Sequence, residues 1–115
     1  MASEASTAER CSHLAALLPQ WLDHLLAQRG LSPRTVEAYG RDVENFFLFA
    51  AEAEDDAPAG GPSDEAAFPS SRDLFHYLAW MRGRGNTGRT LARRLSALRA
   101  FFGYAVEEGA LPANP

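Results

Sequence analysis

The stretch Thr87–Pro115, TGRTLARRLSALRAFFGYAVEEGALPANP, decides the fold of this chain, because it has the pattern of one amphipathic helix followed by a stop signal. Around Leu91, apolar side chains recur at helical spacing and fall within about 60° of it on a helical wheel. They are Leu95, Leu98, Phe102, Ala105 and Val106. Thr87 or Thr90 can cap the start of this helix, and Gly109 suits a left-handed stop. The stretch therefore predicts a long helix with one side facing a core.

The opposite side of the same helix carries arginines separated by small residues. Its members are Arg89, Arg93, Ser96 and Ala100, while Arg94 and Arg99 flank the apolar stripe. Small residues let a helix lie close to a phosphate backbone, and arginine is well shaped to fork onto phosphate or a guanine edge. This side predicts either a contact with nucleic acid or an ordinary surface helix whose arginines are solvated.

Three further helices are expected, over residues 18–29, 33–52 and 71–82. Ser32 is a suitable N-cap for the second helix and Ser70 or Ser71 for the third, where Ser70 followed by Asp73 resembles a capping box. The first is expected to start near Leu18, because Pro19 is tolerated in a first turn but not in a helix interior. No strand-like alternation is present, so the sequence predicts an all-α fold, a compact bundle of four main helices.

The remaining segments are expected to lie outside the helices. Residues 1–17 are expected to form a flexible N-terminus, and residues 18–112 one domain with a modest core. Residues 53–69 are rich in Pro, Gly, Ala and acidic residues and lack an apolar period, which predicts a mobile acidic loop.

The basic residues are unevenly distributed along the chain. The net charge is −4, which by itself argues against a polyanionic partner, and all 11 basic residues are arginines. Between Asp73 and Glu107, however, six arginines occur without any acidic residue. Because the local field rather than the total charge steers a polyanion, this segment remains compatible with nucleic-acid binding.

Several classes of function find no support in the sequence. It contains no Walker loop, GxGxxG, HExxH or paired CxxC motif, so we expect no cofactor, no metal and no catalytic residues. The single Cys11 excludes an internal disulfide. No apolar run reaches the roughly 18–20 residues of a membrane span, and no secretion leader is recognisable, so a cytoplasmic protein without membrane contact is expected.

Two blocks of residues carry a resemblance to a known family. The first block comprises Leu31-Ser32, Thr35, Tyr39, Arg41-Asp42-Val43 and Phe46, and is similar to an LSxxTxxxYxxDLxxF signature. The second comprises Thr87, the run Arg89–Arg99, Phe101-Phe102, Glu108-Gly109 and Asn114-Pro115. In this order and at this separation, the blocks resemble the N-terminal, core-binding, SAM-like domain of tyrosine recombinases and phage integrases of the Xer type.

The resemblance implies a four-helix bundle that grips duplex DNA with its second and fourth helices. The DNA-binding candidates are Arg34, Thr35, Tyr39 and Arg41 on the second helix, and Thr87, Arg89, Thr90, Arg93 and Arg94 on the fourth. It also implies a separate catalytic domain that this chain lacks, with residues 113–115 as the start of the interdomain linker. The chain alone is then a monomer that does not cleave DNA, and other recombinase protomers are its partners in a synaptic complex.

Two other functions remain open on the residues alone. A helical protein–protein interaction module would show an exposed apolar patch and no salt-dependent DNA binding. A helix-turn-helix regulator would use the Gly83–Asn86 turn between two helices near a right angle.

Overall fold

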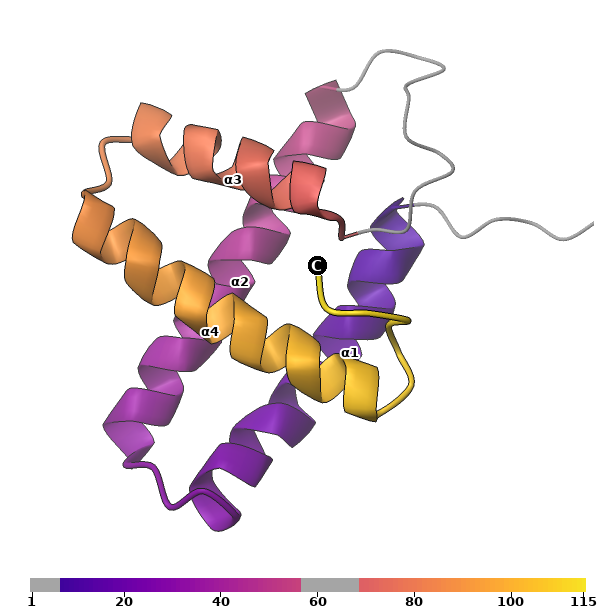
Figure 1. Ribbon diagram of the computed structural model, residues 1–115, viewed down its shortest axis with the longest axis vertical. Coiled ribbons are helices and arrows are strands. Elements are labelled where there is room, and N and C mark those ends of the chain that lie inside the picture. Colours follow the sequence, from indigo (N-terminus) through magenta and orange to yellow (C-terminus); the bar gives the residue numbers. More distant parts are fainter. Residues whose placement is uncertain (1–6, 57–68) are drawn as a thin grey trace, which may run out of the picture.

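The computed structural model describes residues 7–56 and 69–115. They form four helices, shown in Figure 1: α1 (Thr7–Ala27), α2 (Pro33–Asp56), α3 (Ser71–Gly83) and α4 (Gly88–Glu107). No strand occurs within these two ranges. The predicted all-α bundle of four main helices is confirmed.

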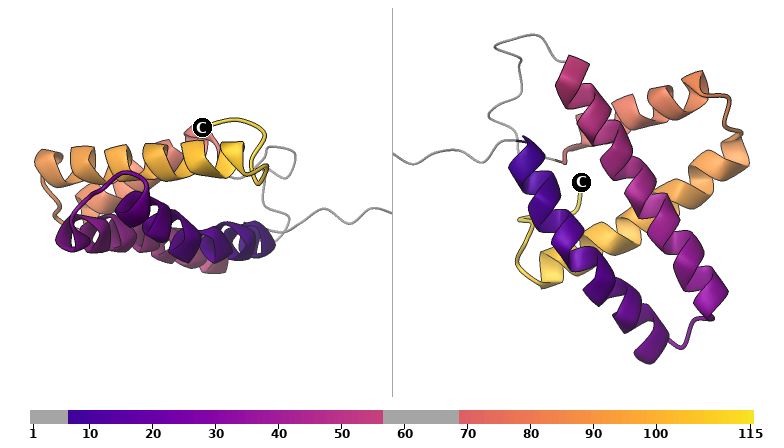
Figure 2. Two further views of the ribbon diagram at one scale, coloured as in Figure 1. Left: turned by 90° about the horizontal axis from the view of Figure 1, so that it is seen from below. Right: turned by 180° about the vertical axis from the view of Figure 1, so that it is seen from behind.

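The four helices form two hairpins that lie in two layers (Figure 2). The α1–α2 hairpin makes one layer, and α4 crosses it from the other layer, contacting both α1 and α2, while α3 contacts α2. The Cα atoms extend 44 × 37 × 19 Å, so the molecule is flat. One side of α4 therefore faces the α1–α2 layer and the opposite side faces solvent.

Helix starts and stops follow the predicted capping residues. The Ser32 hydroxyl accepts a hydrogen bond from the Thr35 amide at 3.1 Å. Ser70 and Asp73 form the predicted capping box at the start of α3, and Thr87 caps α4 by accepting from the Thr90 amide. Behind α4, Gly109 has a φ of 81°, the left-handed conformation expected of a glycine stop.

A single core holds the hairpins together, and aromatic rings dominate it. Phe46 of α2 meets the rings of Tyr77 in α3 and Phe102 in α4 edge-on, with centroid distances of 5.2 and 5.7 Å. Trp21 of α1 meets Phe101 of α4 at 5.3 Å. Such pairs contribute about 0.5–1.5 kcal/mol each beyond the burial of their surface. The core thus contains side chains from every helix.

The first helix begins earlier than the sequence predicts. It starts at Thr7, so residues 7–17 are helical rather than a flexible N-terminus, and Pro19 lies inside the helix. Leu14 is 2% exposed and joins the core. Packing of this apolar face stabilises the added turns and offsets the backbone hydrogen bond that the proline cannot make.

The second helix ends later than predicted, at Asp56, so residues 53–56 belong to α2 and not to the acidic loop. The rest of that predicted loop, up to residue 68, lies outside the described residues.

The buried side of α4 is broader than the predicted stripe. Ala97 and Phe101 are fully buried although neither belongs to the stripe, whereas Leu95 and Val106 are only half-buried. The reason is the crossing geometry, because α4 packs on both α1 and α2 and so buries a wider arc than a helix with one neighbour.

Candidate nucleic-acid interface

A shallow hollow of about 560 Å³ lies between α2 and α4. It is lined by Ala38, Arg41, Asp42, Glu44, Asn45 and Leu48 of α2 and by Arg93 and Arg94 of α4. The two helices that the sequence singled out for DNA contact therefore meet at one open surface, which we call the α2–α4 groove. It brings together Arg41, Arg93 and Arg94 of the predicted site.

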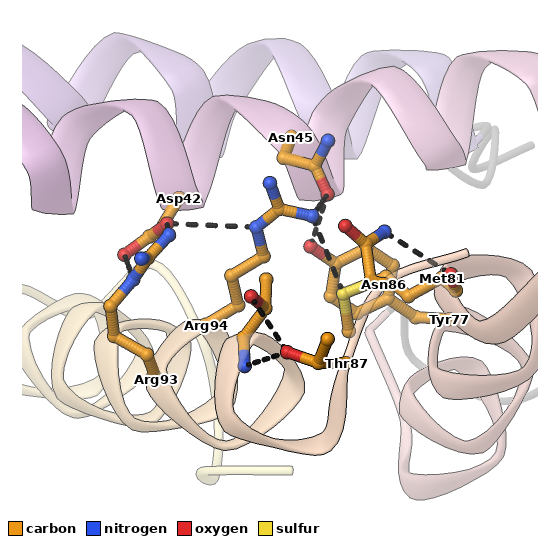
Figure 3. Close-up of polar contacts among 9 residues, drawn as sticks. Asp42, Asn45, Tyr77, Met81, Asn86, Thr87, Arg93 and Arg94 are labelled. Atoms are coloured by element: carbon orange, nitrogen blue, oxygen red, sulfur yellow. Dashed lines mark hydrogen bonds and ion pairs between the residues drawn. The ribbon is translucent and has the colours of Figure 1, made fainter. Parts of the chain in front are cut away.

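Arg93 crosses this groove to Asp42 (Figure 3). Its Nε donates to one carboxylate oxygen at 3.2 Å and its Nη2 to the other at 2.7 Å. Asp42 is 2% exposed, whereas the Arg93 side chain is 54% exposed. The hydrogen bonds and the charge of Asp42 raise the pKa of Arg93 above its ordinary value. The guanidinium is thus anchored along one edge, while much of the side chain stays open to solvent.

Arg94 is directed into the protein instead. Its Nε lies 3.6 Å from an Asp42 oxygen, and its Nη1 donates to the side-chain Oδ1 of Asn45 at 3.2 Å and approaches the Met81 sulfur at 3.7 Å. The side chain is 20% exposed. Arg94 therefore joins α4 to α2 and α3 from within the fold.

Tyr77 completes this polar network beneath the groove. Its hydroxyl donates to the same side-chain Oδ1 of Asn45 at 2.6 Å. Burial raises the pKa of Tyr77 to about 12, against the opposing effect of Arg94, which favours the ionised form. The network of Asp42, Asn45, Tyr77 and Arg94 fixes the helices on which the groove is built.

The start of α4 presents a different environment. Arg89 is exposed, and no ion pair or side-chain hydrogen bond to it occurs within residues 7–56 and 69–115. Thr87 is exposed, but its hydroxyl is occupied in capping the Thr90 amide. Thr90 itself is half-buried. Among these three candidates, Arg89 is the one whose polar side chain is free to reach outward.

The four candidates on α2 also differ from one another. Arg34 is exposed, and Arg41 lies 3.7 Å from Glu37 in an exposed pair. The Thr35 hydroxyl lies 2.9 Å from that of Ser32 in the helix cap. Tyr39 stacks on Trp21 at 6.1 Å, toward α1 rather than in the groove.

The sequence reasoning missed the part played by Asp42 and Asn45. In the sequence, Asp42 stands out only as a member of the first block of the resemblance, and nothing singles out Asn45. Asp42 lies three residues after Tyr39 and four before Phe46, so it falls at the edge of the apolar side of the helix. A carboxylate buried at such a position requires a cationic or hydrogen-bonding partner, and this requirement is the signal that the sequence offers.

Within the described part of the chain, no cluster of His, Cys, Asp and Glu is suited to hold a metal ion. Of the helices described, none combines the length and apolar character required to span a membrane.

A family model for the phage integrase N-terminal SAM-like domain matches residues 18–109, which include about the second half of α1 and all of α2, α3 and α4. The chain belongs to this family. The match covers both helices of the groove and the capping residues between them. It also removes the helix-turn-helix regulator from consideration, since the α3–α4 turn is part of a SAM-like domain.

Xer recombinases are among the relatives of this SAM-like domain. Tyrosine recombinase XerC of Neisseria gonorrhoeae is 37% identical over 101 residues, covering 88% of this chain and 32% of that protein. Tyrosine recombinase XerD of Listeria monocytogenes is 31% identical over 99 residues, covering 86% and 31%. XerC of Methylobacterium nodulans is 42% identical over 89 residues, covering 77% and 26%. No solved structure matches significantly.

The SAM-like domain described here thus spans about a third or less of the length of these relatives. The similarity supports a role in site-specific recombination, and it is confined to the N-terminal domain of the family.

Proposed function

We propose that this chain is the DNA-binding arm of a site-specific tyrosine recombinase and that it grips the duplex of a recombination half-site with α2 and α4. The observation that carries the proposal is the α2–α4 groove, where arginines from both helices line an open surface. Family membership supplies the biological setting. Three arginines and two carboxylates line this surface, and an excess of arginine suits the phosphate backbone of duplex DNA, whose contacts supply most of the affinity.

The exposed arginines differ in whether they have a carboxylate partner. Arg34 and Arg89 are exposed, with no carboxylate partner in residues 7–56 and 69–115. They are free to contact phosphates at the outer ends of the interface. Arg41 can leave its exposed pair with Glu37 at little cost, since such pairs contribute about 0–1 kcal/mol.

Arg94 and Tyr39 have supporting roles in this proposal. Arg94 uses its Nη1 on Asn45 and Met81 and is mostly buried. Tyr39 packs on Trp21. Both hold α2 in place and are not needed as direct contacts, whereas Thr35 and Thr87 position the first turns of α2 and α4. The caps occupy the backbone amides of Thr35 and Thr90, and the other amides at these helix starts are additional donors to phosphate.

The chain by itself does not cleave or rejoin DNA under this proposal. Its match is to the N-terminal domain of a family whose members named here are tyrosine recombinases roughly three times as long. Other recombinase protomers are the partners of the longer protein, and the chain alone is a monomer. A role on chromosomal or mobile DNA also implies the cytoplasm.

Fluorescence anisotropy of a labelled duplex, measured over a series of salt concentrations, tests the proposal. We expect affinity to fall steeply with salt, and Arg89→Ala to lower the slope of log K against log salt by about one unit. Arg72→Ala is the matched control, because Arg72 is an exposed arginine at the opposite end of the α3–α4 hairpin. Equal slopes for both variants would remove Arg89 from the interface.

A protein–protein interaction module remains the second candidate because one exposed apolar patch favours it. Phe75 is 68% exposed, and it borders a hollow of about 220 Å³ on α3 and α4 whose walls include Leu74, Leu78 and Leu95. Absence of any salt-dependent duplex binding would favour this reading.

A further inference from the structure

The carboxylate of Asp42 occupies one edge of the Arg93 guanidinium and leaves another free. Of the five N–H donors of an arginine, Asp42 takes the one on Nε and one on Nη2. The donors on Nη1 and the second donor on Nη2 are not used by Asp42. These remaining donors form a second fork, pointing away from the carboxylate, and a fork of this shape matches the two acceptors of a guanine edge.

The free fork is accessible. The Arg93 side chain is 54% exposed although its partner is 2% exposed, and it lines the open α2–α4 groove. Ala38, a small residue, is another part of the groove lining. A base edge in a major groove can therefore approach this guanidinium from the open side of the groove, which Arg41, Glu44 and Leu48 also line.

We infer that Asp42 positions Arg93 to read a guanine in the major groove, so that Arg93 determines part of the sequence preference of the domain while Arg89 contacts phosphate. The inference rests on the proposed DNA-binding function and assigns separate tasks to two arginines of one helix. Asp42 is a positioning residue in this scheme and touches no DNA.

Asp42 affects Arg93 in two ways, through its negative charge and through the geometry that it imposes. A buried carboxylate cancels much of the long-range attraction of Arg93 for phosphate, since it adds a negative charge within hydrogen-bonding distance. It also fixes the guanidinium plane and so reduces the entropy lost on forming a two-point contact. Arg89, without such a partner, keeps its full charge and its freedom, which suit a phosphate contact.

Selection from a pool of short duplexes with randomised central base pairs, followed by sequencing of the bound fraction, tests this assignment. The wild-type chain is expected to prefer guanine at one position by on the order of tenfold. Arg93→Lys keeps the charge but loses the fork, so the preference at that position should disappear while other preferences remain. Arg89→Lys, the same substitution four residues earlier on α4, should leave every preference unchanged.

Asp42→Asn provides the test of positioning. It removes the carboxylate charge, so total binding to a duplex of arbitrary sequence should stay equal or strengthen, while the guanine preference falls. Circular dichroism establishes whether this variant folds, and Arg93→Lys decides the question if it does not.

Two results would overturn the inference. One is a guanine preference that survives Arg93→Lys, and the other is salt-dependent binding of the wild-type chain without any guanine preference. Either leaves the proposed DNA-binding function intact. No salt-dependent binding to any duplex would overturn both together.

Discussion

Asp42 and Arg93 are 51 residues apart in the chain, and two hydrogen bonds of 3.2 and 2.7 Å join them across the α2–α4 groove. The carboxylate is almost fully buried and also lies 3.6 Å from Nε of Arg94. The Asp42 side chain of α2 thus contacts two arginines of α4 and holds these two helices together.

Asp42→Ala should destabilise the domain. Removing one partner of a buried ion pair costs about 3–5 kcal/mol, and because Arg93 is half exposed we expect a value near the lower end. Glu37→Ala is the control, since Glu37 forms an exposed pair with Arg41 that should contribute less than about 1 kcal/mol. Urea denaturation of the two variants measures the difference. Equal stabilities would show that the Asp42 network does not hold α2 and α4 together.

Two phenylalanines provide a test of the core. Phe101 is fully buried between α1 and α2, whereas Phe75 is 68% exposed. Phe101→Ala should therefore lower the free energy of unfolding by about 3–5 kcal/mol, and Phe75→Ala should change it by no more than about 0.5 kcal/mol. Thermal or urea unfolding measures the free energy of unfolding of the two variants. A large loss with Phe75→Ala would mean that this side chain packs against something in solution.

Tyr77 should make stability fall at alkaline pH. Its pKa is raised from 10.0 to about 12 by burial. Below pH 10 both states are protonated and the stabilisation is complete. Between pH 10 and 12 the unfolded chain releases the phenolic proton and the folded chain keeps it, so stability falls by up to about 1.4 kcal/mol per pH unit.

The variant Tyr77→Phe isolates this contribution. It loses the hydrogen bond to Asn45, which costs about 1 kcal/mol at neutral pH, but it cannot ionise. Urea denaturation across the alkaline range should show the wild-type advantage disappearing and then reversing as the pH rises toward 12. A difference that stays constant with pH would contradict the raised pKa.

The capping box of α3 should also contribute measurably. Ser70 accepts a hydrogen bond from the Asp73 amide, and the Asp73 carboxylate accepts from the Ser70 amide at 2.8 Å. Ser70→Ala should cost about 1 kcal/mol. Ser96→Ala, at an exposed position inside α4, should cost nothing because alanine is the better helix former. A Ser70→Ala variant as stable as wild type would show that the cap is not formed in solution.

Local signals in the sequence predicted most of the fold. Capping residues act within one turn, so Ser32, Ser70 and Thr87 correctly located the starts of α2, α3 and α4. The start of α1 could not be predicted in this way. There, burial of Leu14 in a core formed by distant residues outweighs the local penalty of Pro19.

The site was predicted less completely than the fold. Helical spacing predicts that Arg89 and Arg93 lie away from the core, and both are exposed, but it does not predict that Arg93 reaches Asp42 of α2. It could not show that Arg94, one position further, bonds to Asn45 of α2 beneath the groove. That contact depends on where α4 crosses α2, which is a property of the packed tertiary structure and not of either helix alone.

The central claim, that the α2–α4 groove binds duplex DNA, is tested most directly by titrating a short duplex into the isotopically labelled chain and following backbone amide shifts by NMR. We predict salt-reversible shifts concentrated in residues 34–45 and 87–96, with residues around Phe75 unaffected. Shifts confined to the Phe75 side of α3, or no shifts at low salt, would contradict the account.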